Sequence, residues 1–141
     1  MDTKKANGFT LLELMIVIAV MAVIAAAATN LYQKSVIKAN RTALETGMTQ
    51  CAQKLASYKL VNNSYSVALS SVCGSSVYPT TGTALYDLTL DTSVAGAWTL
   101  TAAPKSGTKQ AGDGGVLLND QGWRCWTKSA TTCTLSSTST W

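Results

Sequence analysis

The most constraining feature of the sequence is an apolar run near its start. Residues 9–28 read FTLLELMIVIAVMAVIAAAA and contain one charged side chain, Glu13. As an α-helix this run is roughly 30 Å long, which is enough to cross a bilayer. The residues before it are polar and include Lys4 and Lys5. We therefore expect this end to stay in the cytoplasm and the rest of the chain to lie across the membrane.

A secretory signal peptide and a plain signal anchor are alternatives for this run. It is long for a signal peptide, and neither alternative explains why Glu13 lies in lipid, where a carboxylate costs at least a few kcal/mol and is usually paired. If the chain is cut between Gly8 and Phe9, the new α-amino group lies one helical turn from Glu13. In a bundle of such helices, that amino group could pair with the carboxylate of a neighbour. The remaining alternative is that Glu13 snorkels to the near interface.

The segment GFTLLE, residues 8–13, resembles the prepilin processing motif. With its short basic leader and apolar helix, the N-terminus is similar to that of the type IVa pilins. The resemblance implies cleavage after Gly8 by prepilin peptidase and N-methylation of Phe9. It also implies an assembly role for Glu13, which would pair with the Phe9 amino group of an adjacent subunit or with a polar group such as its Thr10.

The same resemblance implies the domain organisation and the location of the chain. Residues 1–8 would be the leader peptide, residues 9–29 the transmembrane and filament-core helix, and residues 30–141 a periplasmic globular domain. The protein would wait in the bacterial inner membrane as a single-pass subunit. The assembly machinery would then join it to other pilin subunits in a cell-surface pilus.

Helical periodicity continues beyond the membrane segment. One apolar face is formed by Ile37, Leu44, Met48, Cys51, Leu55 and Tyr58. Their spacing predicts one helix from Phe9 to about Lys59, apolar on all sides at first and then amphipathic. Family members often have a glycine and a proline in this helix, where this chain has Ala22 and Asn30. We therefore expect only a weak break at Thr29-Asn30.

The second half of the chain predicts a sheet. Residues 61–83 read as a Ser-rich loop, and alternation then predicts strands over residues 86–91, 98–102, 116–118 and 123–128. The connections between the strands are short or turn-rich, which favours an antiparallel meander covering the amphipathic part of the helix. The predicted fold is therefore α+β, with one long helix on a four-stranded antiparallel sheet. The pilin resemblance implies the same architecture.

The four cysteines, Cys51, Cys73, Cys125 and Cys133, lie beyond the apolar run. None forms a CxxC pair, so a zinc ribbon is not indicated, and an exported chain favours disulfides. Three pairings are possible, and we favour Cys51–Cys73 and Cys125–Cys133. A C-terminal disulfide loop like the second pair is a feature of pilins. It is usually lacking in the pseudopilins of type II secretion, and this favours a pilus subunit.

The composition does not indicate an enzyme. There is no histidine, which removes the commonest general base and metal ligand. Serine and threonine hydroxyls are inert without an activating base. The segment Gly-Asp-Gly-Gly at residues 112–115 lacks the spacing of a phosphate or calcium loop, and we interpret it as a turn. We predict no catalytic site, no cofactor and no metal.

DNA is a further partner to consider, since the formal net charge is +4. The residues that could form a basic and aromatic patch are Lys105 and Lys109, or Arg124 and Lys128, near Trp98, Trp123 and Trp126. Such a patch could bind DNA by charge and stacking. Solvated charges beside core tryptophans are the simpler interpretation.

These observations predict a structural subunit of a type IV pilus, major or minor, that supports motility, adhesion or DNA uptake. The Trp-Arg-Cys-Trp segment at residues 123–126 and the short C-terminus look somewhat like minor pilins of the PilE type. The alternatives are a DNA-binding pilin for natural transformation and a type II secretion pseudopilin.

Overall fold

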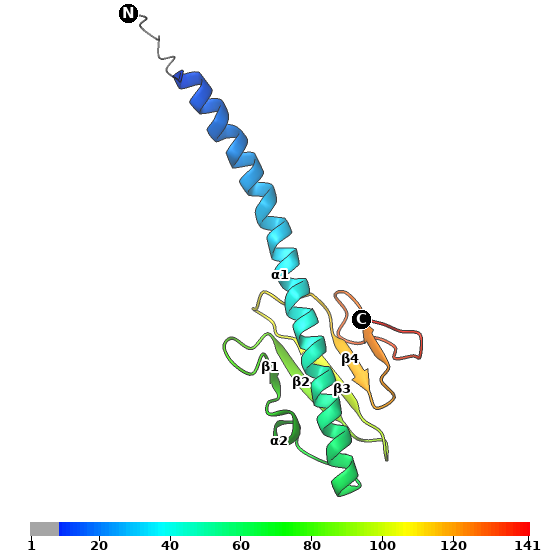
Figure 1. The fold of residues 1–141 in the computed structure, drawn as a ribbon. Helices are drawn as coiled ribbons and strands as arrows, with labels where there is room; N and C mark the ends of the chain where they lie inside the picture. Colours follow the sequence, from blue (N-terminus) through cyan, green and yellow to red (C-terminus); the bar gives the residue numbers. More distant parts are fainter. Residues whose placement is uncertain (1–8) are drawn as a thin grey trace, which may run out of the picture. The chain divides into compact units, whose positions relative to one another are not determined.

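The computed structural model describes residues 9–141. The elements are the helices α1 (Leu11–Asn62) and α2 (Leu69–Cys73) and the strands β1 (Val77–Tyr78), β2 (Tyr86–Asp91), β3 (Thr99–Pro104), β4 (Val116–Asn119) and β5 (Arg124–Trp126), labelled where space allows in Figure 1. The chain divides into two units, one ending at Val36 and the other running from Ile37 to Trp141. Each unit is described by itself.

In the first unit, α1 begins at Leu11 and is long and apolar enough to cross a membrane. Its large apolar side chains are exposed, as a lipid-facing helix requires. The helix runs through Thr29 and Asn30 without interruption, so the weak break expected there is absent. The hydroxyl of Thr29 donates to the carbonyl of Ala26 at 3.0 Å, which gives this polar group a partner inside the helix.

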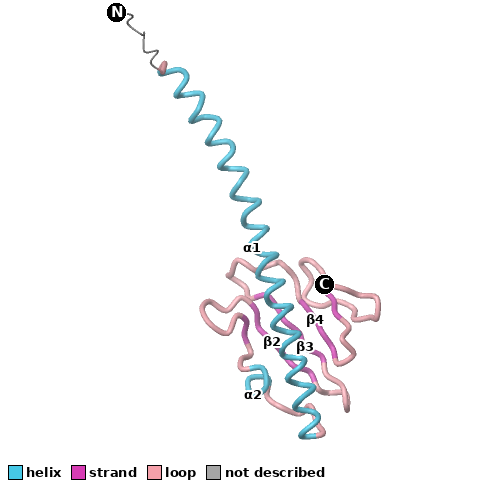
Figure 2. The backbone as a smooth tube through the Cα atoms, viewed as in Figure 1, coloured by secondary structure: helices cyan, strands magenta, loops and turns pink. Residues whose placement is uncertain are grey.

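In the second unit, the five strands form one antiparallel sheet in the order β1-β2-β3-β4-β5. Leu100 of β3 lies opposite Leu90 of β2 and Leu118 of β4. From Ile37 on, α1 lies across one face of this sheet, as Figure 2 shows. This is the predicted α+β meander.

The core lies between α1 and the sheet. Its buried apolar side chains are Leu44, Met48, Cys51 and Leu55 from α1, Leu69 from α2, Trp98 just before β3, and Tyr86, Leu88, Leu100, Ala102, Val116 and Leu118 from the sheet. The middle of the predicted helical face is thus buried, while its ends, Ile37 and Tyr58, are only half-buried. Alternate residues of β2 point to the core or to solvent, as its sequence predicts.

The prediction of four strands was wrong, because the segment interpreted as a loop, residues 61–83, contains α2 and β1. A strand of two residues is too short to show alternation. Tertiary contacts explain β1 instead. The Tyr78 hydroxyl donates to the carbonyl of Ala43 at 2.9 Å. Gly47 leaves room for the Tyr78 ring, since a Cβ there would lie 2.7 Å from ring atom Cε2.

Candidate functional site

Asp113 is the centre of a buried polar cluster in the loop between β3 and β4, and is only 8% exposed. Its Oδ1 pairs with the Arg41 guanidinium of α1 at 2.5 Å. Its Oδ2 accepts hydrogen bonds from the Tyr86 hydroxyl at 3.2 Å and from the Gln110 amide at 2.9 Å. A buried carboxylate needs such partners because it has lost its hydration. Asp113 therefore joins α1, β2 and its own loop.

Gln110 fastens the same loop to α1 a second time. Its side chain is fully buried. The amide nitrogen also donates to the carbonyl of Ile37 at 2.9 Å, and the amide oxygen accepts from the Asn40 side chain at 3.2 Å. The β3–β4 loop is thus bound to the part of α1 where the second unit begins.

Trp126 of β5 closes the cluster from the other side. The Arg41 guanidinium carbon lies 3.7 Å from the centre of the Trp126 ring, a cation–π contact that also covers the ring. The indole N–H donates to the carbonyl of Asp113 at 3.1 Å. We define the Asp113 junction as Arg41, Tyr86, Gln110, Asp113 and Trp126.

Burial raises the pKa of two groups, Tyr86 in the junction and Glu45 beside it. It raises the pKa of the Tyr86 hydroxyl, and the nearby Asp113 carboxylate acts in the same direction, so Tyr86 stays a neutral donor. Burial also raises the pKa of Glu45, although the Arg41 guanidinium opposes this shift. Glu45 lies 3.8 Å from Arg41 Nε, so Arg41 is shared between two carboxylates.

The loop closed by Cys125–Cys133 lies against the β3–β4 loop. The backbone N–H of Ser129 donates to the carbonyl of Asp113 at 3.4 Å, and its hydroxyl donates to the carbonyl of Gly112 at 3.3 Å. The Cys125 and Cys133 Cα atoms are 6.0 Å apart across the disulfide. This is one of the two favoured cysteine pairs. The other, Cys51–Cys73, ties α1 to α2.

Two glycines allow these loops to approach closely. A Cβ on Gly114 would run into the carbonyl oxygen of Thr127, and one on Gly115 into that of Thr131. The Gly115 N–H donates to the carbonyl of Ala130 at 2.7 Å. The Gly-Asp-Gly-Gly segment is therefore a packing element with a buried hub, which the interpretation as a turn missed.

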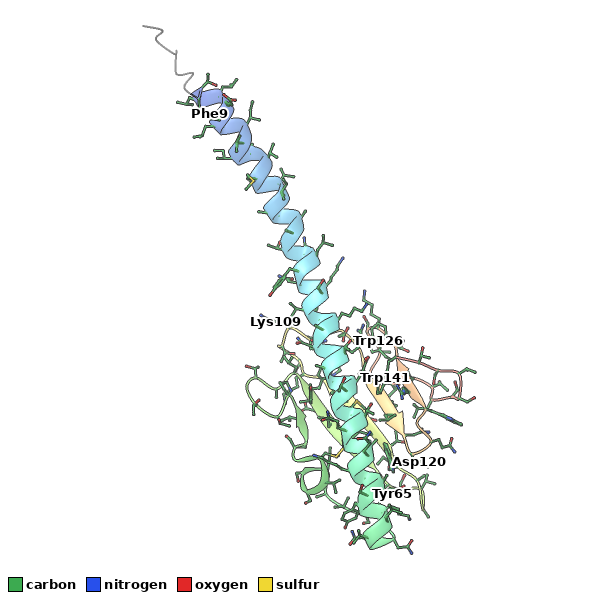
Figure 3. The ribbon with its side chains drawn as sticks, in the orientation of Figure 1. Phe9, Tyr65, Lys109, Asp120, Trp126 and Trp141 are labelled. Carbon is green, nitrogen blue, oxygen red and sulfur yellow. A yellow bond between two sulfur atoms is a disulfide. The ribbon has the colours of Figure 1, made fainter. Side chains whose placement is uncertain are left out.

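Three exposed lysines lie next in sequence to residues that are bonded at the junction. Lys38 follows Ile37, Lys109 precedes Gln110, and Lys128 precedes Ser129, so each adjoins a residue that the junction holds. The ion pairs within residues 9–141 are formed by Arg41 and Lys105, and none involves these lysines. Figure 3 shows Lys109 and Trp126 at one end of the sheet and Tyr65 and Asp120 at the other. We call Lys38, Lys109 and Lys128 the lysine corner.

Only part of the predicted basic and aromatic patch adjoins the Asp113 junction in sequence. Lys109 and Lys128 both belong to the lysine corner. Lys105 instead pairs with the Asp87 carboxylate at 2.8 Å. Arg124 lies over the Trp141 ring at 4.9 Å.

The tryptophans of that patch do not form an open stacking surface. Trp98 is buried in the core, and Trp126 is half-buried beneath Arg41. Trp123 is also half-buried. Binding of phosphate groups would therefore depend on the lysine ammonium groups and not on stacking against these tryptophans. For Trp98, the interpretation as a core tryptophan is confirmed.

Of the predicted N-terminal site, Gly8 lies outside the described residues. Phe9 is 81% exposed. The Thr10 hydroxyl accepts a hydrogen bond from the backbone N–H of Glu13 at 3.3 Å, so Thr10 occupies the N-cap position of α1. Thr10 and Glu13 have the spacing of a capping box, with the acidic side chain three residues after the cap.

Sequence reasoning missed Asp113, Gln110 and Lys38. The signal that could have found Asp113 is an acidic residue between glycines, just before the apolar strand at residues 116–118. Gln110 carries no such signal, because its burial depends on packing against α1. Within the described part of the chain, no group of three or more His, Cys, Asp or Glu side chains could hold a metal ion.

The chain matches two known families. Residues 31–121 match the type IV minor pilin ComP, DNA uptake sequence receptor. The chain belongs to this family. Residues 3–29 match the prokaryotic N-terminal methylation motif. The protein is therefore a type IV minor pilin, a structural subunit anchored in the inner membrane and assembled into a surface pilus.

A solved structure shares the fold. It is the SeMet crystal structure, in the orthorhombic form, of the non-core minor pilin PilV from Neisseria meningitidis. The two chains are 16% identical, with a TM-score of 0.55 over 73% of this chain and 96% of that one. No curated protein matches the chain.

Proposed function

We propose that this minor pilin binds double-stranded DNA at the pilus surface through the lysine corner and thereby supports DNA uptake. The observation that carries the proposal is the placement of three exposed lysines next in sequence to Ile37, Gln110 and Ser129, which are hydrogen-bonded to one another through the Asp113 junction. Among the described residues, no ion pair involves Lys38, Lys109 or Lys128. The family to which the chain belongs is described as a DNA uptake sequence receptor, which supports the same assignment.

The chemistry is that of phosphate binding. A lysine ammonium is a compact point charge that binds a phosphate oxygen and releases a condensed counterion. If all three lysines of the corner contact phosphates, log K should fall with log salt with a slope of about −2.7. Phosphate contacts position a protein on DNA without reading its sequence. The corner would thus supply affinity, and any sequence preference would come from base contacts elsewhere.

The test is fluorescence anisotropy of a labelled duplex titrated with the mature full-length chain in non-ionic detergent, over a series of salt concentrations. The triple variant Lys38→Gln, Lys109→Gln and Lys128→Gln should lose most of the salt dependence. A matched variant with Lys54→Gln, Lys59→Gln and Lys105→Gln loses the same charge elsewhere and should keep it. Equal losses in both variants would show that net charge binds the DNA, and that the corner is not a site.

The N-terminal residues support a second proposal, on processing and assembly. The chain would be cut after Gly8, methylated at Phe9 and assembled through Glu13, with residues 30–141 as the periplasmic domain. The match to the methylation motif over residues 3–29 supports this. Thr10 would act first as the helix cap, which leaves the Glu13 carboxylate for a neighbouring subunit. N-terminal sequencing of a Gly8→Arg variant tests the cleavage, and a mature chain that still begins at Phe9 would exclude it.

A further inference from the structure

We infer that Asp113 is a positioning residue for DNA binding: through the Asp113 junction it sets where Lys38, Lys109 and Lys128 stand relative to one another. The inference rests on the proposed DNA-binding function and deepens it. Asp113 does not contact DNA here, since its carboxylate is buried and already occupied by Arg41, Tyr86 and Gln110.

Each lysine of the corner comes from a different segment of the chain. Lys38 lies on α1, Lys109 in the β3–β4 loop and Lys128 beyond β5. Asp113 bonds to all three segments. Its carboxylate pairs with Arg41 on α1 and accepts from Gln110 in the loop, and its carbonyl accepts from Ser129 beyond β5.

Holding the three segments in place lowers the conformational entropy that is lost when DNA binds. Duplex phosphates are regularly spaced, so lysines on independent loops would have to be ordered one by one when DNA binds. A corner whose three segments are already joined by hydrogen bonds has these segments ordered before the encounter. Gly114 and Gly115 support this, because only glycine allows the β3–β4 loop to lie against the carbonyls of Thr127 and Thr131.

Charge and positioning make opposite predictions for Asp113. A carboxylate repels phosphate, so Asp113→Asn should strengthen DNA binding if only net charge matters. If the carboxylate holds the segments of Lys38 and Lys109 in place through Arg41 and Gln110, the same substitution should weaken binding. The sign of the change therefore separates the two roles.

The matched control is Asp120→Asn. Asp120 is exposed in the turn after β4 and lies at the opposite end of the sheet in Figure 3. Its substitution makes the same change in net charge without touching the junction. We expect Asp120→Asn to bind duplex DNA as tightly as the wild type or slightly more tightly.

The experiment is the salt titration of a labelled duplex with the mature full-length chain in detergent. For Asp113→Asn we expect about a 10-fold loss of affinity at 0.1 M salt and a slope reduced by about 0.9 or more, the value of one lost phosphate contact. A purely structural role would lower the folded fraction and leave the slope of the folded molecules at the wild-type value. Unchanged or tighter binding by Asp113→Asn would overturn the inference.

Gln110→Met carries the same test if Asp113→Asn does not fold. It keeps the length and charge of the side chain while removing its bonds to Ile37, Asn40 and Asp113, and it should lower both affinity and slope. A wild-type slope in this variant would also overturn the inference. A wild-type chain that does not bind DNA would instead remove the proposed function itself. Wild-type binding that is lost only in the triple lysine variant would keep the function and exclude the role of Asp113.

Discussion

The pair between Arg41 and Asp113 gives a quantitative prediction for stability. The side chains of Arg41 and Asp113 are only 15% and 6% exposed, so the small value of a surface ion pair does not apply. Arg41→Met keeps the length of the side chain over Trp126 but leaves the Asp113 carboxylate buried without its cation. Breaking a buried pair in this way costs about 3–5 kcal/mol. For a domain of this size that corresponds to a loss of at least about 12 °C in Tm.

Urea unfolding followed by tryptophan fluorescence measures this loss. All four tryptophans lie in the second unit, so the signal reports on that unit even in the full-length chain. In the double variant with Asp113→Asn, the total loss should be smaller than the sum of the single losses, because no uncompensated charge remains. A loss below about 1 kcal/mol for Arg41→Met would place the pair with surface salt bridges and refute the reasoning.

Three further predictions follow from other residues. Burial raises the pKa of Glu45 above its ordinary value of 4.5, so the folded state binds the Glu45 proton more tightly than the unfolded state does. The free energy of unfolding should therefore fall as pH rises from 4.5 through the folded-state pKa. Glu45→Gln should flatten this part of the pH profile of unfolding. Gly115→Ala should cost about 1–3 kcal/mol in urea unfolding, because its Cβ meets the Thr131 carbonyl, and an unchanged midpoint would argue against the close contact. Glu13→Val should leave the chain processed and in the membrane but poorly recruited to sheared filaments, whereas normal incorporation would show that Glu13 merely snorkels.

The fold was predictable where local pattern and packing agree. The apolar run, the helical face around Leu44 to Leu55 and the alternation of β2 each follow from one period of hydrophobicity. The short elements β1 and α2 were not predictable, because contacts between distant residues form them. Tyr78 reaches the carbonyl of Ala43 from a segment with no periodicity of its own.

The candidate site was predictable only in part. Lys109 and Lys128 could be named from sequence as basic residues of the second half, but nothing local indicates that the residue before Lys38 is bonded to Gln110. Asp113 and Gln110 bind α1 through partners that lie 72 and 73 residues away in sequence. A polar residue becomes a buried hub through such contacts, which are not visible in spacing or composition.

The measurement that tests the central claim most directly is DNA capture by assembled pili. Filaments sheared from cells carrying the wild-type chain, or the triple variant of Lys38, Lys109 and Lys128 to Gln, are incubated with fluorescent duplex DNA and imaged. Immunoblotting first establishes that both chains are present in the filaments in equal amount. We predict that the triple variant assembles normally and captures much less DNA than the wild type. Equal capture by the two kinds of filament would contradict the account.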